Sequence, residues 1–210
     1  MVETAMKLDL LVFYGSVRST RRGIGAARFV VDQCRKRGHE VALVDPVEHP
    51  LPLLDKMYKE YPAAGAPEPL ERLARLVKAA DAYVIVSGEY NHTVPPALVN
   101  LLDHFLEEYF YKPSAIVCYS AGPWGGVRAA MTLRAMVAEL GMSSIPSIFP
   151  IAAVQDAFQL DGTPNDARLT AKIGTFLDEL EWYARALKAE REREKAARSE
   201  CEAMQRVPKA

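Results

Sequence analysis

The sequence predicts an α/β protein in which helices cover both faces of one parallel sheet. Short apolar runs alternate with segments of helical hydrophobic period, which is the pattern of strand–helix–strand units around such a sheet. The chain has 210 residues, of which 50% are hydrophobic, so it is long enough for one domain with a substantial core. No internal repeat is apparent along the chain. Together these observations favour a single three-layer domain.

Five apolar runs of strand length are the predicted strands of this sheet. They are residues 8–13, 40–44, 82–87, 115–119 and 147–151. The segments between them are long enough to return the chain to the same edge of the sheet, so each strand is followed by a crossover. All five strands are therefore expected to run parallel.

Helical patterns occupy most of these crossovers. Residues 25–37 carry apolar side chains on one stripe and stop before Gly38. Residues 70–80 form a second predicted helix. Pro95 and Pro96 open a third, because proline favours the first turn, and residues 127–140 form a fourth. We expect the third helix to continue through the aromatic stretch 105–111, whose excess of exposed aromatic surface then predicts a homodimer or homotetramer.

Right-handed crossovers over five parallel strands give a three-layer sandwich with the strand order 2-1-3-4-5. This flavodoxin-like arrangement is expected for residues 1–187. Residues 46–69 are rich in proline and have no clear period, which predicts a long loop that acts as a lid or a subunit contact. Residues 188–210 mix charges of both signs, which predicts a charged helical extension at the C-terminus.

Composition excludes several classes of function. The formal net charge of -1 argues against nucleic-acid binding by bulk electrostatics. No apolar run approaches the ~20 residues of a membrane span, and the first residues lack the features of a secretion signal, so we expect a soluble, cytoplasmic protein without a membrane partner. The three cysteines and four histidines show no spacing typical of a disulfide framework or a metal site.

The loop after the first strand, GSVRSTRRG, is predicted to bind a phosphate group. It does not match a nucleoside-triphosphate loop, because no lysine lies between Lys7 and Lys36. It does not match a dinucleotide fingerprint either, because Arg28 stands at the third glycine position. Its hydroxyl and guanidinium groups can surround a terminal phosphate at the start of the following helix. An exposed basic turn is the alternative.

Two further loops meet the first at the carboxyl edge of the sheet, where open α/β sheets bind their ligands. The loop SGEYNHTVPP follows the third strand and offers an aromatic side chain in a rigid turn. The loop SAGPWGGVR follows the fourth strand, and its three glycines let the backbone approach a flat ligand. A phosphate site beside two loops suited to a planar ring describes flavin mononucleotide (FMN) better than a nucleoside triphosphate.

The three stretches GSVRSTRRG, GEYNHTVPPALVNLLDHF and YSAGPWGGVRAAMTLRAMVAELG together resemble the NADPH-dependent FMN reductase family, over about residues 8–150. The resemblance implies a flavodoxin-like fold, bound FMN, NADPH or NADH as the electron donor, and a homo-oligomer. The cofactor-binding residues that we predict with it are Ser16, Arg18, Arg21, Gly23 and Ile24 in the first loop, Glu89, Tyr90, Asn91 and His92 in the second, and Ser120, Ala121, Gly122, Trp124, Gly125 and Gly126 in the third.

The chain departs from the family pattern at three of these loop positions. Gly88 stands where many members have proline before the Glu-Tyr-Asn triplet, and Arg21 and Gly23 stand where many have serine and asparagine. We expect Gly88 to keep the turn possible and Arg21 to add positive charge for the phosphate.

The family resemblance implies an FMN-dependent NAD(P)H oxidoreductase that reduces quinone-like, azo or other small acceptors. Because donor and acceptor are expected to occupy the same space above the flavin in turn, we expect ping-pong hydride transfer. No side chain is predicted to be catalytic, because the flavin supplies the reactive atom. The alternative is a flavodoxin-type electron carrier or an FMN-dependent sensor that acts on a protein partner, although such carriers tend to be strongly acidic. A phosphate-binding module without flavin is a third possibility.

Overall fold

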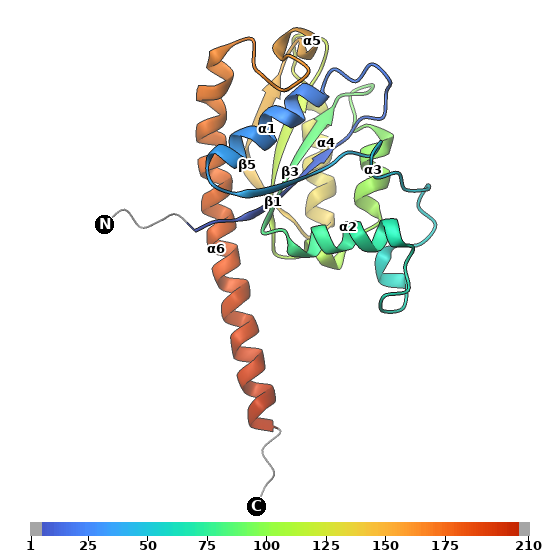
Figure 1. Cartoon of the computed structure of the whole chain (residues 1–210), viewed down its shortest axis with the longest axis vertical. Coiled ribbons are helices and arrows are strands. Elements are labelled where there is room, and N and C mark those ends of the chain that lie inside the picture. Colours follow the sequence, from blue (N-terminus) through green and yellow to red (C-terminus); the bar gives the residue numbers. More distant parts are fainter. Residues whose placement is uncertain (1–5, 206–210) are drawn as a thin grey trace, which may run out of the picture.

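The computed structural model describes residues 6–205 and shows a five-stranded parallel sheet between two layers of helices (Figure 1). The strands stand in the order β2-β1-β3-β4-β5, and each neighbouring pair is parallel. Their bounds are β1 Asp9–Tyr14, β2 Glu40–Val44, β3 Ala82–Gly88, β4 Pro113–Tyr119 and β5 Ser143–Ile151. The predicted fold class and strand order are therefore confirmed.

Two layers of helices bury the two faces of the sheet in separate cores. Helices α1 and α6 cover one face, and α2, α3 and α4 cover the other (Figure 1). The bounds are α1 Ile24–Lys36, α2 Glu68–Ala79, α3 Pro96–Asp103, α4 Val127–Glu139, α5 Val154–Ala157 and α6 Ala167–Gln205. Among the described residues, no helix combines the length and the apolar character that a membrane crossing requires.

The central strands β3 and β4 are buried along their whole length, which explains why they have continuous apolar sequences. Their register pairs Gly88 with Tyr119, so both strands end side by side. Tyr14, the last residue of β1, pairs with Val86. The loops after β1, β3 and β4 therefore leave the sheet at one edge, as the sequence predicts.

Strand β5 begins at Ser143, four residues earlier than the predicted segment 147–151. Its first half is polar and partly exposed and includes Pro146, so it lacks an apolar pattern. Proline is tolerated there because β5 lies at the edge of the sheet. Pairing with β4 supplies the order that the local sequence does not predict.

The prediction that α3 continues through residues 105–111 is wrong. The helix ends at Asp103, and the chain turns inward so that Phe105 and Tyr109 are fully buried. The Tyr109 ring packs edge-on against Tyr83 at 5.3 Å between centroids. Phe105 and Tyr109 therefore belong to the core, whereas Phe110 and Tyr111 are 38% and 70% exposed. The exposed aromatic surface is smaller than a continuous helix would give, and the subunit interface inferred from it stays a prediction.

The proline-rich loop after β2 ends at Pro67, because α2 begins at Glu68, two residues before the predicted helix start at residue 70. It contains one short 3-10 helix, Tyr58–Glu60. Leu51 and Tyr61 are half-buried and pack against the core under α2 and α3. The loop is therefore seated on the body of the fold, while its role as a lid or contact stays a prediction.

Helix α6 runs beyond the body of the fold, and a charged cluster holds its first half in place (Figure 1). Arg37 forms ion pairs with Asp178 and Glu181, and His39 Nε2 lies 3.1 Å from a Glu181 oxygen. Burial alone would raise the pKa of Glu181, but hydrogen bonds from His39 and Arg37 outweigh it and lower the pKa to about 2. Glu181 therefore remains ionised at neutral pH.

The predicted domain boundary after residue 187 falls inside α6, which continues across it without a break. Lys188 and Arg191, just beyond that position, lie 2.8 and 3.6 Å from the carboxylate of Asp81. The division into residues 1–187 and 188–210 stays a prediction, and residues 206–210 of the extension lie outside the described residues.

Candidate functional site

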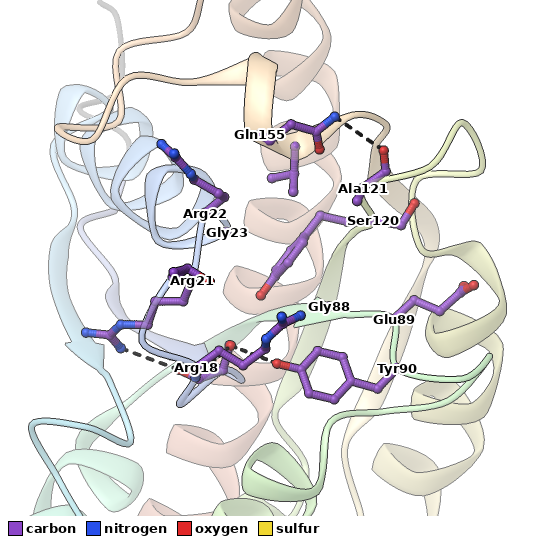
Figure 2. A pocket seen from close by; sticks show the side chains of 14 residues that line it. Arg18, Arg21, Arg22, Gly23, Gly88, Glu89, Tyr90, Ser120, Ala121 and Gln155 are labelled. Atoms are coloured by element: carbon purple, nitrogen blue, oxygen red, sulfur yellow. Dashed lines mark hydrogen bonds between the residues drawn. The ribbon is translucent and has the colours of Figure 1, made fainter.

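The three loops enclose a cavity of about 220 Å³ at the carboxyl edge of the sheet (Figure 2). Side chains and backbone from the first loop form one wall, and the second and third loops form the other. The lining residues are Ser16, Arg18, Thr20, Arg21, Arg22, Gly23, Gly88, Glu89, Tyr90, Tyr119, Ser120, Ala121, Val154 and Gln155. The structure thus brings together eight of the fifteen predicted cofactor-binding residues: Ser16, Arg18, Arg21, Gly23, Glu89, Tyr90, Ser120 and Ala121.

Ser16 connects the first loop to the second. Its hydroxyl lies 3.0 Å from the Tyr90 hydroxyl and accepts a longer hydrogen bond, 3.4 Å, from the backbone N–H of Arg18. Ser16 itself is only 3% exposed. The serine therefore fixes the distance between the two walls of the cavity and orients the tyrosine.

The two predicted phosphate arginines have different surroundings. Arg21 forms an ion pair with the buried carboxylate of Asp45, and its guanidinium also lies 5.6 Å from the Tyr14 ring centre. Arg18 is exposed, and within residues 6–205 its guanidinium has no hydrogen bond or ion pair. Figure 2 shows the two side chains pointing in opposite directions. The charge of Arg21 is compensated by the protein, whereas the charge of Arg18 is free for a ligand.

The start of α1 supplies backbone donors beside these arginines. The N–H groups of Thr20, Arg22 and Gly23 are not used in hydrogen bonds among the described residues, and all three residues line the cavity. The helix that follows has 13 residues, so its dipole places partial positive charge at this end. Free N–H groups at a helix start, next to an uncompensated arginine, form an anion site. Ile24 begins the helix behind this loop and is buried, outside the cavity lining.

Glu89 stabilises the start of α4 with its carboxylate. The two oxygens accept hydrogen bonds from the backbone N–H groups of Arg128 and Ala129, at 3.1 and 3.4 Å, and from the Arg128 guanidinium at 2.8 Å. This acidic cap satisfies the orphan donors of that helix. Between the starts of α1 and α4, α1 is therefore the one that remains available to an anion.

Asn91 and His92 form the tip of a tight turn rather than a wall of the cavity. Tyr90 and Thr93 exchange two backbone hydrogen bonds of 2.9 and 3.0 Å across this turn. The φ angles of Asn91 and His92 are 50° and 66°, as a two-residue turn of this kind requires. Both tip residues are exposed. The turn directs Tyr90 toward Ser16.

The glycines of the third loop shape the backbone beside the cavity. Gly125 and Gly126 have φ angles of 62° and 80°, and a Cβ at Gly126 would lie 2.7 Å from the backbone N and O of Tyr119. Trp124 is 64% exposed and packs near the Arg128 guanidinium, at 5.9 Å from the ring centre. These residues and Gly122 lie outside the cavity lining. They shape the loop that places Ser120 and Ala121 in the cavity wall.

Six lining residues were not among the fifteen predicted cofactor-binding residues: Thr20, Arg22, Gly88, Tyr119, Val154 and Gln155. Thr20 is nevertheless one of the first-loop hydroxyl residues that we expect to be able to surround a phosphate. Val154 and Gln155 come from α5, after β5, where no motif marks a ligand contact. Tyr119 is the last residue of β4 and looks like an ordinary strand residue. No group of three or more His, Cys, Asp or Glu side chains that could hold a metal ion occurs in the described part of the chain.

A family model described as NADPH-dependent FMN reductase matches residues 8–156, which include all three loops. The chain belongs to the NADPH-dependent FMN reductase family. It is therefore an oxidoreductase whose cofactors are FMN and a reduced nicotinamide dinucleotide. The residues present fit FMN, because the free Arg18 and the unused N–H groups at α1 provide a phosphate site next to the cavity.

Individual relatives agree with the family assignment. The chain is 29% identical over 140 residues to the NADPH azoreductase of a Bacillus species, covering 66% of this chain and 74% of that protein. It is 31% identical over 132 residues to the quinone reductase of Escherichia coli, covering 61% and 68%. Among solved structures it resembles FerB, a flavoenzyme NAD(P)H:(acceptor) oxidoreductase from Paracoccus denitrificans, with a TM-score of 0.68, 23% identity and coverage of 84% and 98%. The last similarity shows a shared fold.

Proposed function

We propose that the protein is an FMN-dependent NAD(P)H oxidoreductase that reduces small acceptors such as quinones and azo compounds. The observation that carries this proposal is the anion site at α1, with Arg18 uncompensated, in the wall of a cavity that is also lined by the second and third loops. The similarity to an azoreductase and a quinone reductase supports the acceptor class.

The residues of the chain bind and orient in this proposal, and none acts as a nucleophile. Bound FMN supplies hydride transfer between the nicotinamide and the acceptor. Arg18 and the N–H groups of the first loop hold the phosphate, with Ser16 and Tyr90 setting the width of the cavity. Glu89 fixes α4, and with it the loop that contains Ala121. The side of the cavity away from the sheet is left for the two substrates.

We expect the donor and the acceptor to occupy that open side in turn, so that the kinetics are ping-pong. Varying a soluble quinone at several fixed NADPH concentrations should then give parallel double-reciprocal lines, with inhibition at high NADPH. Ala121→Trp, which adds bulk at an exposed lining position without positive φ, should slow flavin reduction and flavin reoxidation together in rapid mixing. Any change in the FMN affinity of this variant should be shared by riboflavin, because the phosphate site is at the opposite wall.

Intersecting lines would indicate a ternary complex and rule out the shared substrate position. A protein that binds FMN but is reduced by neither NADPH nor NADH would contradict the oxidoreductase proposal and favour the electron carrier. The same experiments with NADH in place of NADPH determine which nicotinamide is preferred.

We also propose a homodimer, or a homotetramer built from it, in which α4 forms the contact. Met131 is 50% exposed, and Ala135 and Ala138 extend its exposed stripe at helical spacing. Trp124, just before the helix, is 64% exposed. An exposed apolar face of this kind marks an interface. Met131→Glu should convert the oligomer to a monomer in sedimentation velocity at micromolar concentration, whereas Trp182→Ser on the opposite helical layer should not. A monomeric unmodified protein would contradict this proposal.

We place the enzyme in the cytoplasm. Cys34 and Cys118 are buried free thiols, which suits a reducing compartment.

A further inference from the structure

Tyr119 reaches from the end of β4 to the start of α1, across the end of β3. Its hydroxyl donates to the Tyr14 hydroxyl at 3.4 Å, and its ring stacks on the Tyr14 ring at 6.4 Å between centroids. Tyr119 is 7% exposed and is one of the cavity-lining residues, so its accessible surface faces the candidate cofactor site. No other described aromatic side chain from β4 lines this cavity.

Two glycines make room for this ring. A Cβ at Gly23 would lie 2.1 Å from Tyr119 Cζ and 2.5 Å from its hydroxyl oxygen, and a Cβ at Gly88 would lie 3.0 Å from the ring edge. Gly23 has an ordinary helical φ of -65°, so glycine is required there for space and not for backbone conformation. Gly23 and Gly88 are two of the positions at which the chain departs from the usual family pattern. In the structure both glycines lie against the same side chain, Tyr119.

The Tyr119 hydroxyl lies where an anion would bind. Gly23 is the N-cap of α1, and a Cβ added there would lie 2.5 Å from the Tyr119 hydroxyl oxygen. The hydroxyl therefore lies at the N-cap of α1, beside the unused N–H groups of the first loop. Burial raises the pKa of Tyr119 well above that of a free tyrosine, so the hydroxyl remains protonated and can donate. Its bond to Tyr14 is long compared with the ~2.7–2.8 Å that O–H···O bonds prefer, so a phosphate oxygen is a better acceptor.

We propose that Tyr119 is a binding residue for the FMN phosphate, which donates a hydrogen bond from its hydroxyl through the space left by Gly23. This inference rests on the proposed function of the site. Arg21 of the first loop is already paired with Asp45. Tyr119, at the end of β4, thereby adds a hydrogen-bond donor to the phosphate site of that loop. In this proposal Tyr119 recognises the phosphate group of FMN and not the flavin ring.

The test is a titration of the full-length protein with FMN and with riboflavin, in which quenching of flavin fluorescence reports binding. Tyr119→Phe keeps the ring that packs on Tyr14 and removes only the hydroxyl. We expect it to weaken FMN binding roughly tenfold, the range for a hydrogen bond to a charged group, and to leave riboflavin binding within about twofold. The ³¹P resonance of bound FMN should shift between the two proteins. Tyr14→Phe is the matched control, because Tyr14 is fully buried and outside the cavity lining, and it should not change FMN affinity.

The outcomes separate this inference from the proposed function. Unchanged FMN affinity in Tyr119→Phe, or equal losses for FMN and riboflavin, would overturn the role of Tyr119 while the unmodified protein still binds FMN. An unmodified protein that binds neither flavin would overturn the proposed function, and this inference with it. A selective loss for FMN together with a shifted phosphorus resonance supports the proposal.

Discussion

Replacing Arg18 with alanine should weaken FMN binding by roughly ten- to a hundredfold and leave riboflavin binding almost unchanged. A charge-assisted hydrogen bond to a phosphate contributes about 1.5–3 kcal/mol, which corresponds to this range of affinity. The guanidinium of Arg18 has no internal partner among the described residues, so its removal should not disturb the fold. Fluorescence titration with both flavins measures the ratio, and a urea titration of the protein without flavin should show an unchanged midpoint.

Arg21→Ala provides the contrasting variant, because its partner Asp45 is buried. Removing the arginine leaves that carboxylate, whose side chain is 2% exposed, without its cation. Breaking a buried pair in this way typically costs 3–5 kcal/mol, and because the Arg21 side chain is 20% exposed we expect about 2–3 kcal/mol here. The urea midpoint should therefore fall in Arg21→Ala and not in Arg18→Ala. If Arg18→Ala weakens both flavins equally, Arg18 does not bind the phosphate.

This difference between two neighbouring arginines is not visible in the sequence. Asp45 follows the last residue of β2, and it meets the first loop only because β1 and β2 pair in parallel with Phe13 opposite Val44. The sequence predicts both strands, but a local pattern does not indicate which side chain of one loop will pair with another 24 residues away. The loop lies beside the cavity, as its position after β1 predicts, and its phosphate binding stays a prediction. The distribution of its charges depends on tertiary structure.

Glu89 shows the same limit at the second loop. The sequence predicts that the loops after β3 and β4 meet, because parallel strands end at one edge. Which way the carboxylate turns depends on the start of α4, 39 residues later, where two backbone N–H groups require an acceptor. The strands, by contrast, could be predicted well because burial on both faces leaves a continuous apolar run, as in β3 and β4.

Gly126→Ala should destabilise the protein by about 3 kcal/mol and weaken flavin binding, although it adds one methyl group. The residue is the N-cap of α4 and has φ 80°, a conformation that costs a residue with a side chain roughly 1–2 kcal/mol. The new Cβ would also lie 2.7 Å from the backbone N and O of Tyr119, and backbone atoms in a buried strand cannot move cheaply. Urea denaturation measures the stability, and titration with FMN measures the site.

The effect on binding follows from what the Tyr119 carbonyl does. It accepts the backbone N–H of Glu89 at 3.1 Å, so a displaced carbonyl loosens the contact between the second and third loops. Gly122→Ala in the same loop is the matched control, because a Cβ there meets nothing within 4 Å and no positive φ is required. That variant should match the unmodified protein in both assays. If Gly126→Ala and Gly122→Ala behaved alike, the flavin site would not depend on close packing of the third loop against the backbone of β4. A loss confined to Gly126→Ala would instead show that the flavin site depends on backbone contacts between loops as well as on the side chains that line it.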